Sequence, residues 1–507
     1  MGLPCCGSTG SEPTRRAMNR MRHLRAGILP NIVTLTLIAA CNLAVAVDAR
    51  SAPAPISLEQ SPPPRYEQYV VADSKTGARA KVIVLSYRRA GRNRPVIFAF
   101  NGGPGASSLW LNYGMLGPTR ITLPQPGENS AGKFMPVPDR TSPLDVADVV
   151  LVDPVGTGLS RVIEGDPKAF FSTATDGAAV ASVVRAWLRR NGRLGSSVYI
   201  LGESFGCQRA ATVAHELVSV VSPSGPDAVN LRGVILVSQE LNSPEVDERR
   251  GTRNIISYVV GLTDIARAAR YHHLLDDHGH PVIGTDEEVT AFASTTYLEA
   301  LFRGRDLAND QAQGIASRLN SYTGIPRSWF LRHELAITRG EFALQALKTK
   351  GERLSTYDDR IVGPENGGDP FEESVDKRFV ESALADLRRI SPGVSLDDYR
   401  ASSDAISNEF HYGFHGGATG ERPFIGYLKE VLAKRPQSKV LIVGGLYDLH
   451  TTSEITLYML SQEDLAHDRV QTAFYPAGHM VYTSDTGRVA FSRILHRLIE
   501  ETAVAGE

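Results

Sequence analysis

The chain contains little cysteine, no strong excess of either charge and no long unbroken apolar run. Of its four cysteines, Cys5, Cys6 and Cys41 lie near the N-terminus, so Cys207 alone remains in the region expected to fold and no internal disulfide can form there. The net charge of −2 argues against nucleic acid as the main partner. The most apolar stretch is interrupted by Pro30, so a membrane span is the least favoured interpretation of it.

The first 50 residues differ in composition from the rest of the chain. Arginines between residues 15 and 25 precede the apolar stretch, a pattern typical of an export signal, and translation starting at Met18 or Met21 would keep that signal. Ala44-Val45-Ala46 predicts cleavage and release, whereas Ile38-Ala39-Ala40-Cys41 resembles a bacterial lipobox, in which Cys41 would be lipidated. We therefore expect residues 1–46 to be an export signal and the protein to be periplasmic or extracellular, either free or anchored through Cys41.

The pattern after the signal predicts an α/β fold. Residues 47–65 are rich in proline and are expected to form a linker. Short apolar runs then alternate with helical patterns, which indicates a doubly wound, mostly parallel sheet of about eight strands. From residue 241 to residue 432 helical patterns dominate. We expect residues 66–240 and 433–507 to form the core, and residues 241–432 to form a helical cap over the edge of the sheet where such folds bind ligands. The expected strands are Glu67–Val71, Ala80–Arg88, Pro95–Phe100, Asp148–Val152, Ser197–Leu201, Arg232–Val237, Lys439–Val443 and Val470–Phe474.

The segment Val198–Gly206 predicts a nucleophile. Its apolar first half indicates a strand, and it ends in a G-x-S-x-G pattern centred on Ser204 and followed by a helical stretch. In such a strand–turn–helix the serine lies in a strained turn with its side chain above the sheet edge. Glycines are needed on both sides because Cβ atoms there would collide as strand and helix pack. Since this pattern alone is only moderately specific, a base, an orienting acid and an oxyanion site are also required.

Two later strands predict the base and the acid. In sheets with such a turn the chain order is serine, then an acid, then histidine, each just past the end of a strand. Asp448 follows the apolar run 440–443, and His479 follows the run 470–474. Both side chains are therefore expected to reach the sheet edge that presents Ser204.

Other candidate residues are given ordinary interpretations. His450 is interpreted as a loop histidine, because it is too close to Asp448 in sequence to be oriented by it and also reach the serine. Asp464 and Asp468 fall in a polar connection, where solvated charges are the rule. Cys207, one turn after the serine, is expected to be a buried structural thiol.

The loop after the strand Pro95–Phe100 predicts an oxyanion site. It reads Asn101-Gly102-Gly103-Pro104-Gly105-Ala106-Ser107-Ser108, and its paired glycines let the backbone turn N–H groups inward. A second N–H group should come from Phe205, the residue after the nucleophile.

Four segments, in order along the chain, resemble signature motifs of the serine carboxypeptidases. They are Asn101-Gly102-Gly103-Pro104-Gly105 with Ser107-Ser108, Asp153-Pro154-Val155-Gly156-Thr157-Gly158-Leu159-Ser160, Gly202-Glu203-Ser204-Phe205 and Ala477-Gly478-His479-Met480.

The resemblance favours the bacterial branch of that family, because Tyr322-Thr323-Gly324 and Tyr357-Asp358-Asp359-Arg360 look like segments of its cap. Three residues depart from the usual pattern: Phe205 replaces a tyrosine, Leu159 a phenylalanine, and Tyr482 stands where a proline often follows. These positions are expected on pocket walls, so they bear on side-chain preference rather than on the reaction.

The resemblance implies an α/β-hydrolase fold and a serine-type carboxypeptidase that acts on peptide C-termini through an acyl-enzyme. It implies a catalytic triad, a pair of oxyanion donors and a group of residues that hold the substrate's terminal carboxylate. The implied triad is Ser204, Asp448 and His479. The implied oxyanion donors are Gly103 and Phe205, and the implied carboxylate-binding residues are Asn101, Gly102 and Glu203. A free Glu203 carboxylate would repel an anionic substrate terminus, but a protonated one would donate a hydrogen bond to it. Activity is therefore expected to favour acidic pH.

Other functions stay open. The same scaffold could carry an esterase, an acyltransferase or an aminopeptidase, although Asn101 and Glu203 argue against the aminopeptidase, and a catalytically inactive binding protein is the alternative outside the enzymes. No cofactor is expected, because triad chemistry needs none. The histidines and aspartates between residues 272 and 280 lack the spacing of a tetrahedral metal site and are interpreted as a solvated helix end.

Overall fold

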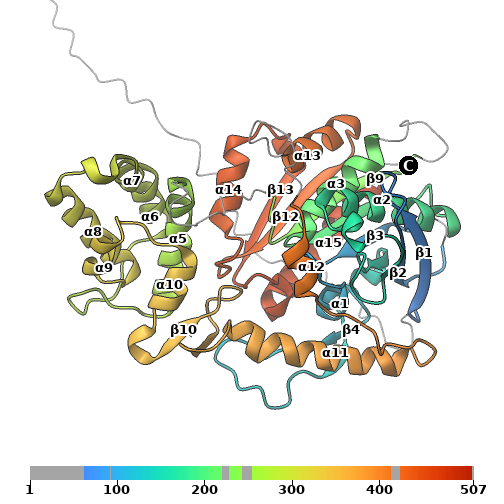
Figure 1. The fold of residues 1–507 in the computed structure, drawn as a ribbon, viewed down its shortest axis with the longest axis horizontal. Helices are drawn as coiled ribbons and strands as arrows, with labels where there is room; N and C mark the ends of the chain where they lie inside the picture. Colours follow the sequence, from blue (N-terminus) through green and yellow to red (C-terminus); the bar gives the residue numbers. More distant parts are fainter. Residues whose placement is uncertain (1–61, 92, 220–227, 242–253, 413–422, 505–507) are drawn as a thin grey trace, which may run out of the picture. The chain divides into compact units, whose positions relative to one another are not determined.

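The main β-sheet contains the eight strands expected from the sequence, with bounds that agree to within two residues at each end. In sheet order they are β1 (Arg65–Ala72), β2 (Arg79–Tyr87), β6 (Asp148–Val152), β3 (Val96–Phe100), β8 (Val198–Glu203), β9 (Leu231–Val237), β12 (Lys439–Gly445) and β13 (Val470–Tyr475). A ninth strand, β7 (Arg161–Glu164), pairs with β2. Figure 1 shows the sheet with helices on both of its faces.

The computed structural model describes residues 62–504 except residue 92 and the segments 220–227, 242–253 and 413–422. The chain divides into a unit Met1–Ala54 and a unit Pro55–Glu507, and all described residues belong to the second. The predicted export signal, its two processing sites and most of the predicted linker lie outside the described residues. Within the described part of the chain, no helix combines the length and the hydropathy that a membrane crossing requires.

The sheet is parallel from β6 to β13 and antiparallel at the β1–β2 side. The carboxyl ends of β3, β8, β9, β12 and β13 therefore lie along one edge, which is where loops carry ligand-binding residues in open α/β sheets. Because these strands are buried on both faces, they are almost wholly apolar.

Helices cover both faces of the sheet. Alternate residues of β3 show this directly, since Phe98 and Phe100 belong to one apolar cluster and Ile97 and Ala99 to the other. The first cluster contains residues of α2 (Thr173–Arg190), α3 (Gly206–Ser219) and α13 (Pro423–Lys434), and the second contains residues of α11 (Lys377–Ile390) and α15 (Asp485–Val504). The fold is thus a doubly wound α/β sheet.

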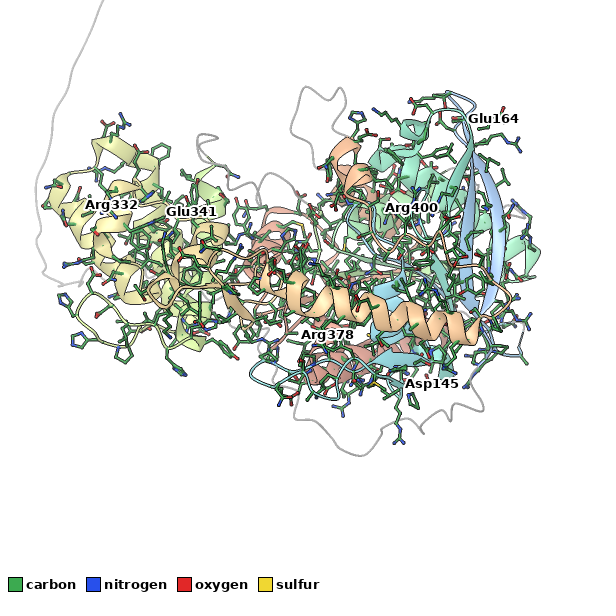
Figure 2. All side chains as sticks on the ribbon, turned by 60° about the horizontal axis from the view of Figure 1, so that its bottom comes forward. Asp145, Glu164, Arg332, Glu341, Arg378 and Arg400 are labelled. Carbon is green, nitrogen blue, oxygen red and sulfur yellow. The ribbon has the colours of Figure 1, made fainter. Side chains whose placement is uncertain are left out.

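The region predicted to be a cap is divided in two by the structure. Residues 255–354 form an apolar cluster of their own. Its helices are α5 (Ile255–Tyr271), α6 (Asp286–Phe292), α7 (Leu298–Arg303), α8 (Asn309–Thr323), α9 (Arg327–Arg332) and α10 (Arg339–Gln345), drawn in yellow-green to yellow in Figure 1. By contrast, α11 packs against the core, and Arg378 on it, labelled in Figure 2, lies 4.2 Å over the ring of Phe134.

Short elements complete the fold. They are α1 (Leu109–Leu111), the hairpin of β4 (Thr119–Ile121) and β5 (Pro136–Pro138), the hairpin of β10 (Glu352–Leu354) and β11 (Val362–Pro364), α12 (Asp404–Glu409) and α14 (Ser453–Gln462).

Candidate active site

The turn between β8 and α3 presents Ser204. The serine has a φ of +58°, a conformation that costs free energy for a residue with a Cβ atom, and it is partly exposed while its neighbours are buried. Its N–H donates to the carbonyl of Val237 at the end of β9, at 2.9 Å. A Cβ atom on Gly202 would lie 2.0 Å from the carbonyl oxygen of Gly206, so only glycine allows strand and helix to come this close.

Asp448 and His479 lie side by side at the same edge. Asp448 follows β12, His479 follows β13, and the distance between Oδ2 of Asp448 and Nδ1 of His479 is 2.8 Å. Both residues are almost fully buried. Burial disfavours a charged imidazole, but the Asp448 carboxylate more than compensates, and the pKa of His479 is raised above its usual range. Burial likewise opposes ionisation of Asp448, yet interaction with His479 holds the pKa of that carboxyl below its usual range.

In the part of the chain that it describes, the structure has no hydrogen bond between the side chains of Ser204 and His479. Such contacts are often long in free enzymes and form when substrate binds, so the separation is compatible with a triad. The structure therefore brings two of the three predicted members into contact and places the third on the neighbouring turn.

A hydrogen-bonded loop fixes the acid. Oδ1 of Asp448 accepts the backbone N–H groups of His450 and Thr451, and Oδ2 accepts the Thr451 hydroxyl at 2.7 Å. The Thr451 oxygen also lies 3.2 Å from Nδ1 of His479. The Asp448 carboxylate is therefore held in one orientation toward the imidazole. Sequence reasoning missed Thr451, although a threonine three residues after a predicted catalytic acid was a usable signal.

The segment after β10 joins the acid and base loops. The N–H of His479 donates to the carbonyl of Tyr357 at 2.6 Å, that of Leu449 to the carbonyl of Thr356, and that of Asp359 to the carbonyl of Tyr447. Leu449 itself is buried in the apolar cluster of residues 255–354. The family-like segment Tyr357–Arg360 thus links the cap to both catalytic loops.

The His450 ring lies closer to the site than a plain loop histidine would. It stacks on Tyr357 at 5.4 Å between ring centroids and lies edge-on to His479 at 5.3 Å. The residue as a whole is exposed, yet burial lowers the pKa of its imidazole to about 4, and neither ring contact makes it the partner of Ser204. Tyr357 and His450 are therefore candidate walls of the substrate site.

The loop after β3 packs against the nucleophile turn. A Cβ atom on Gly102 would lie 2.7 Å from both the carbonyl oxygen of Glu203 and the nitrogen of Phe205, so the backbones are in direct contact. Neither the N–H of Gly103 nor that of Phe205 donates a hydrogen bond within the described residues. Both are therefore available to an oxyanion formed beside Ser204.

Two buried acids hold that loop in place. Asp153 accepts the N–H and the hydroxyl of Ser108 at 2.9 Å and 2.7 Å. Arg209 of α3 is ion-paired to Asp176 of α2 at 2.6 Å and also donates to the carbonyl of Asn101 at 2.6 Å. The loop is thus tied to both helices beneath it.

Glu203 is buried beside the nucleophile with one oxygen free. Its Oε1 accepts from the Asn101 amide at 2.6 Å, whereas Oε2 is buried without a hydrogen bond within the described residues. The hydroxyl of Tyr482, which is also buried without a hydrogen bond of good geometry there, faces Glu203 closely enough to oppose the rise in the pKa of that carboxyl. Burial raises the pKa of Glu203 to about 7, so the side chain keeps its proton at mildly acidic pH.

Cys207 and the histidine-rich segment take no part in this arrangement. Cys207 is buried, and its Sγ donates to the carbonyls of Gly202 and Val237. In the histidine-rich segment, Asp276 accepts the N–H groups of His278 and His280 and so closes a turn. Among the described residues no group of three potential metal ligands is found.

A doubly wound sheet with a serine on a strand–turn–helix, and with an aspartate–histidine pair after the last two strands, defines the α/β-hydrolase class. The model of the serine carboxypeptidase family matches residues 59–288. The match covers less than half of the chain, so over these residues the chain is similar to that family.

Individual relatives show the same likeness. Serine carboxypeptidase-like 36 of Arabidopsis thaliana is 26% identical over 221 residues, which cover 42% of this chain and 42% of that protein, so the chain spans less than half the length of this curated relative. Among solved structures, the prohormone-processing carboxypeptidase Kex1(Δ)p of Saccharomyces cerevisiae gives a TM-score of 0.56 at 14% identity and covers 87% of this chain and 92% of that chain. This second likeness shows the fold.

Proposed function

We propose that the protein is an exported serine carboxypeptidase that removes C-terminal residues from peptides or proteins through an acyl-enzyme intermediate. The observation that carries the proposal is Glu203: a buried carboxyl with a raised pKa, adjacent to the nucleophile and held by Asn101. A serine hydrolase that acts on uncharged substrates has no need of such a group.

In the proposed reaction, Ser204 attacks the last peptide carbonyl while His479 accepts its proton. Asp448 stabilises the imidazolium, and the N–H groups of Gly103 and Phe205 bind the oxyanion. His479 then protonates the departing amine, which leaves an ester on Ser204. A water molecule, deprotonated by His479, hydrolyses that ester and restores the serine.

The free end of the substrate would be recognised by Asn101, Gly102 and Glu203. With its proton in place, Glu203 can donate from Oε2, the oxygen that has no partner in the described residues, to the terminal carboxylate. Once ionised it would repel that carboxylate instead. Free-acid peptides should therefore be cleaved best below neutral pH.

The test compares two N-blocked tripeptides that differ only in a free or an amidated C-terminus. We expect release of the C-terminal residue from the free acid and much slower cleavage of the amide, together with fluorophosphonate labelling of the wild type but not of Ser204→Ala. Equal cleavage of both peptides would favour a different serine hydrolase, such as an esterase. Failure of the probe to label Ser204 would favour an inactive binding protein.

The export route has a separate test. Mass spectrometry of the mature N-terminus would give a start just after Ala46 for a released protein, or a lipidated Cys41 for an anchored one. An intact N-terminal segment would contradict both.

A further inference from the structure

The chain just after β9 runs along the rim of the catalytic edge. The hydroxyl of Ser238 donates to the carbonyl of His479, and the carbonyl of Glu240 accepts the side-chain amide of Gln208 at 2.7 Å. Gln208 lies one turn after Ser204 on α3. Glu240 is therefore anchored by its backbone between the nucleophile helix and the histidine loop.

Among the described residues, no positively charged side chain pairs with the carboxylate of Glu240. The side chain is half-buried, and within the described residues it has no hydrogen bond and no ion pair. Its negative charge interacts with His479 and Tyr412. A partly desolvated carboxylate without a partner is unfavourable, and a cation placed beside it removes much of that cost.

Aromatic rings provide an apolar wall in the same area. Phe205, the residue after the nucleophile, lies edge-on to Phe410 and Tyr412, with ring centroids 5.0 Å and 5.7 Å apart. Phe205 and Phe410 are buried and Tyr412 is exposed, so Tyr412 is the ring of this group that a substrate side chain can reach. Aromatic faces pack against the methylene stem of a long side chain, and the carboxylate suits its charged end.

We propose that Glu240 gives this site a preference for peptides with a cationic side chain, lysine or arginine, on a residue flanking the scissile bond. The inference deepens the proposed carboxypeptidase function and rests on it. The chemistry recognised is the same whether the cation belongs to the C-terminal residue or to the penultimate one.

The experiment compares matched N-blocked peptides in two series. In one series lysine or norleucine is the C-terminal residue, and in the other it is the penultimate residue before a C-terminal alanine. Norleucine has the apolar stem of lysine without the charge. We expect the wild type to prefer lysine in one series by about tenfold or more in kcat/KM, because a charge-assisted contact is worth roughly 1.5–3 kcal/mol. The series that shows the preference identifies the position.

Variants test the role of Glu240 itself. In Glu240→Gln the lysine preference should fall to near unity, while kcat/KM for norleucine peptides and fluorophosphonate labelling of Ser204 change little. The matched control is Glu216→Gln, a half-buried glutamate on α3 away from the site, which should keep the preference. If Glu240→Gln does not fold, Glu240→Asp serves instead, since a shorter side chain should weaken the preference and keep its sign.

A pH series adds a readout that a purely structural glutamate would not give. Burial raises the pKa of Glu240 to about 7, although the positive charge of His479 opposes the shift. Among the described residues, the other titratable groups that interact with Glu240 are Tyr412 and Cys207, whose pKa values are raised, so both stay neutral over the working range. The lysine-to-norleucine ratio should therefore increase from about pH 5 to about pH 8.

Three results are distinguishable. A wild type that cleaves norleucine and lysine peptides equally in both series, or a preference that survives in Glu240→Gln, would overturn the inference and leave the carboxypeptidase function intact. A wild type that cleaves no free-acid peptide would remove the proposed function and this inference with it.

Discussion

Ser204 and Glu203 are neighbours with opposite environments. The serine is partly exposed in a strained turn, whereas the glutamate points into the protein and is 2% exposed. This difference follows from the alternation of side chains at the end of β8. One residue can thus meet the reacting carbonyl while the next one keeps a proton.

Asp448→Asn tests the acid of the triad. An asparagine keeps the shape of the side chain but removes the charge that raises the pKa of His479, so kcat should fall by on the order of 10⁴-fold with little change in KM. Steady-state kinetics measures this. The control is Asp464→Asn, an exposed aspartate in the polar connection before β13, which should leave activity unchanged. A loss of less than about tenfold in Asp448→Asn would contradict the assigned role.

Glu203→Gln tests the carboxyl clamp through pH. In the wild type, kcat/KM for a free-acid peptide should fall as pH rises through about 7, because Glu203 loses the proton it donates. An ester or amidated substrate should lose less. Glutamine cannot ionise, so the ratio of the two substrates should become nearly independent of pH in the variant. Parallel pH profiles for both substrates in the wild type would contradict the proposed role of Glu203 in binding the terminal carboxylate.

At the scale of residues, the sequence predicted the catalytic side chains that directly follow strands. It did not predict the side chains that reach the site through the packing of distant segments. Asp448 and His479 were predictable because each follows an apolar run, and the structure places them 2.8 Å apart. Tyr357 lies in a segment that resembles the family's cap, but that likeness does not indicate its ring contact with His479, and Glu240 lies in no motif. Their positions depend on how the segment after β10 and the end of β9 fold back on the catalytic loops, which no local pattern reports.

At the scale of elements, α2 and α3 are joined by a buried ion pair that also serves the active site. Arg209 and Asp176 are both almost fully buried, and Arg209 also holds the Asn101 carbonyl. The packing of these two helices therefore sets the position of the oxyanion loop.

Asp176→Ala should destabilise the protein by about 3–5 kcal/mol, because it leaves the Arg209 guanidinium buried without a counter-charge. The control is Glu164→Ala, labelled at the edge of Figure 2, whose ion pair with Arg79 is exposed and should contribute less than about 1 kcal/mol. Urea unfolding measures both. Similar losses in the two variants would show that the buried pair has no special role.

Element boundaries were predictable where a pattern is long and uniform. The helical pattern over residues 205–218 predicts one helix, and the structure has α3, Gly206–Ser219, there. The pattern over residues 286–302 also predicts one helix, but the structure has α6 and α7 separated by a π-helical turn at Ala293–Tyr297. A third pattern predicts a helix over residues 244–273, of which the structure describes α5, since residues 244–253 lie outside the described residues. The hairpins β4–β5 and β10–β11 have three-residue strands, too short to give a hydrophobic period.

For the whole molecule, buried carboxyls decide how stability depends on pH. Burial raises the pKa values of Glu203, Glu240 and Glu454 to about 7, and that of Asp153 is raised as well. The folded protein therefore binds more protons than the unfolded chain between about pH 4.5 and pH 7. The free energy of unfolding falls as pH rises across this window. His450, whose pKa burial lowers to about 4, opposes this effect in the same window, but one imidazole is outweighed by the several carboxyls. Asp448, whose pKa is lowered, has its opposite effect at more acidic pH.

We expect the melting temperature to be about 3 °C or more higher near pH 5 than near pH 7.5 at equal ionic strength. Differential scanning calorimetry measures this, and Glu203→Gln should reduce the difference because a glutamine cannot ionise. A melting temperature that rises with pH would contradict the prediction.

The fold class was predictable because eight apolar runs alternate with helical patterns, and such an alternation has few solutions. The division of the region after β9 into a separate helical cluster and helices that pack on the core was not predictable. Both parts have the same helical period. Membership of the bacterial branch stays a prediction.

The order of the strands along the chain has a consequence for the timing of synthesis. Ser204 and the Asn101–Ser108 loop are made early, whereas Asp448 and His479 come from strands that follow the whole insertion, and β13 forms the outermost position of the sheet beside β12. A growing chain therefore carries Ser204 for 275 residues before it carries its base, His479. On the proposed function, hydrolysis can begin only when the last two strands have joined the sheet, so an incomplete chain cannot act on its neighbours.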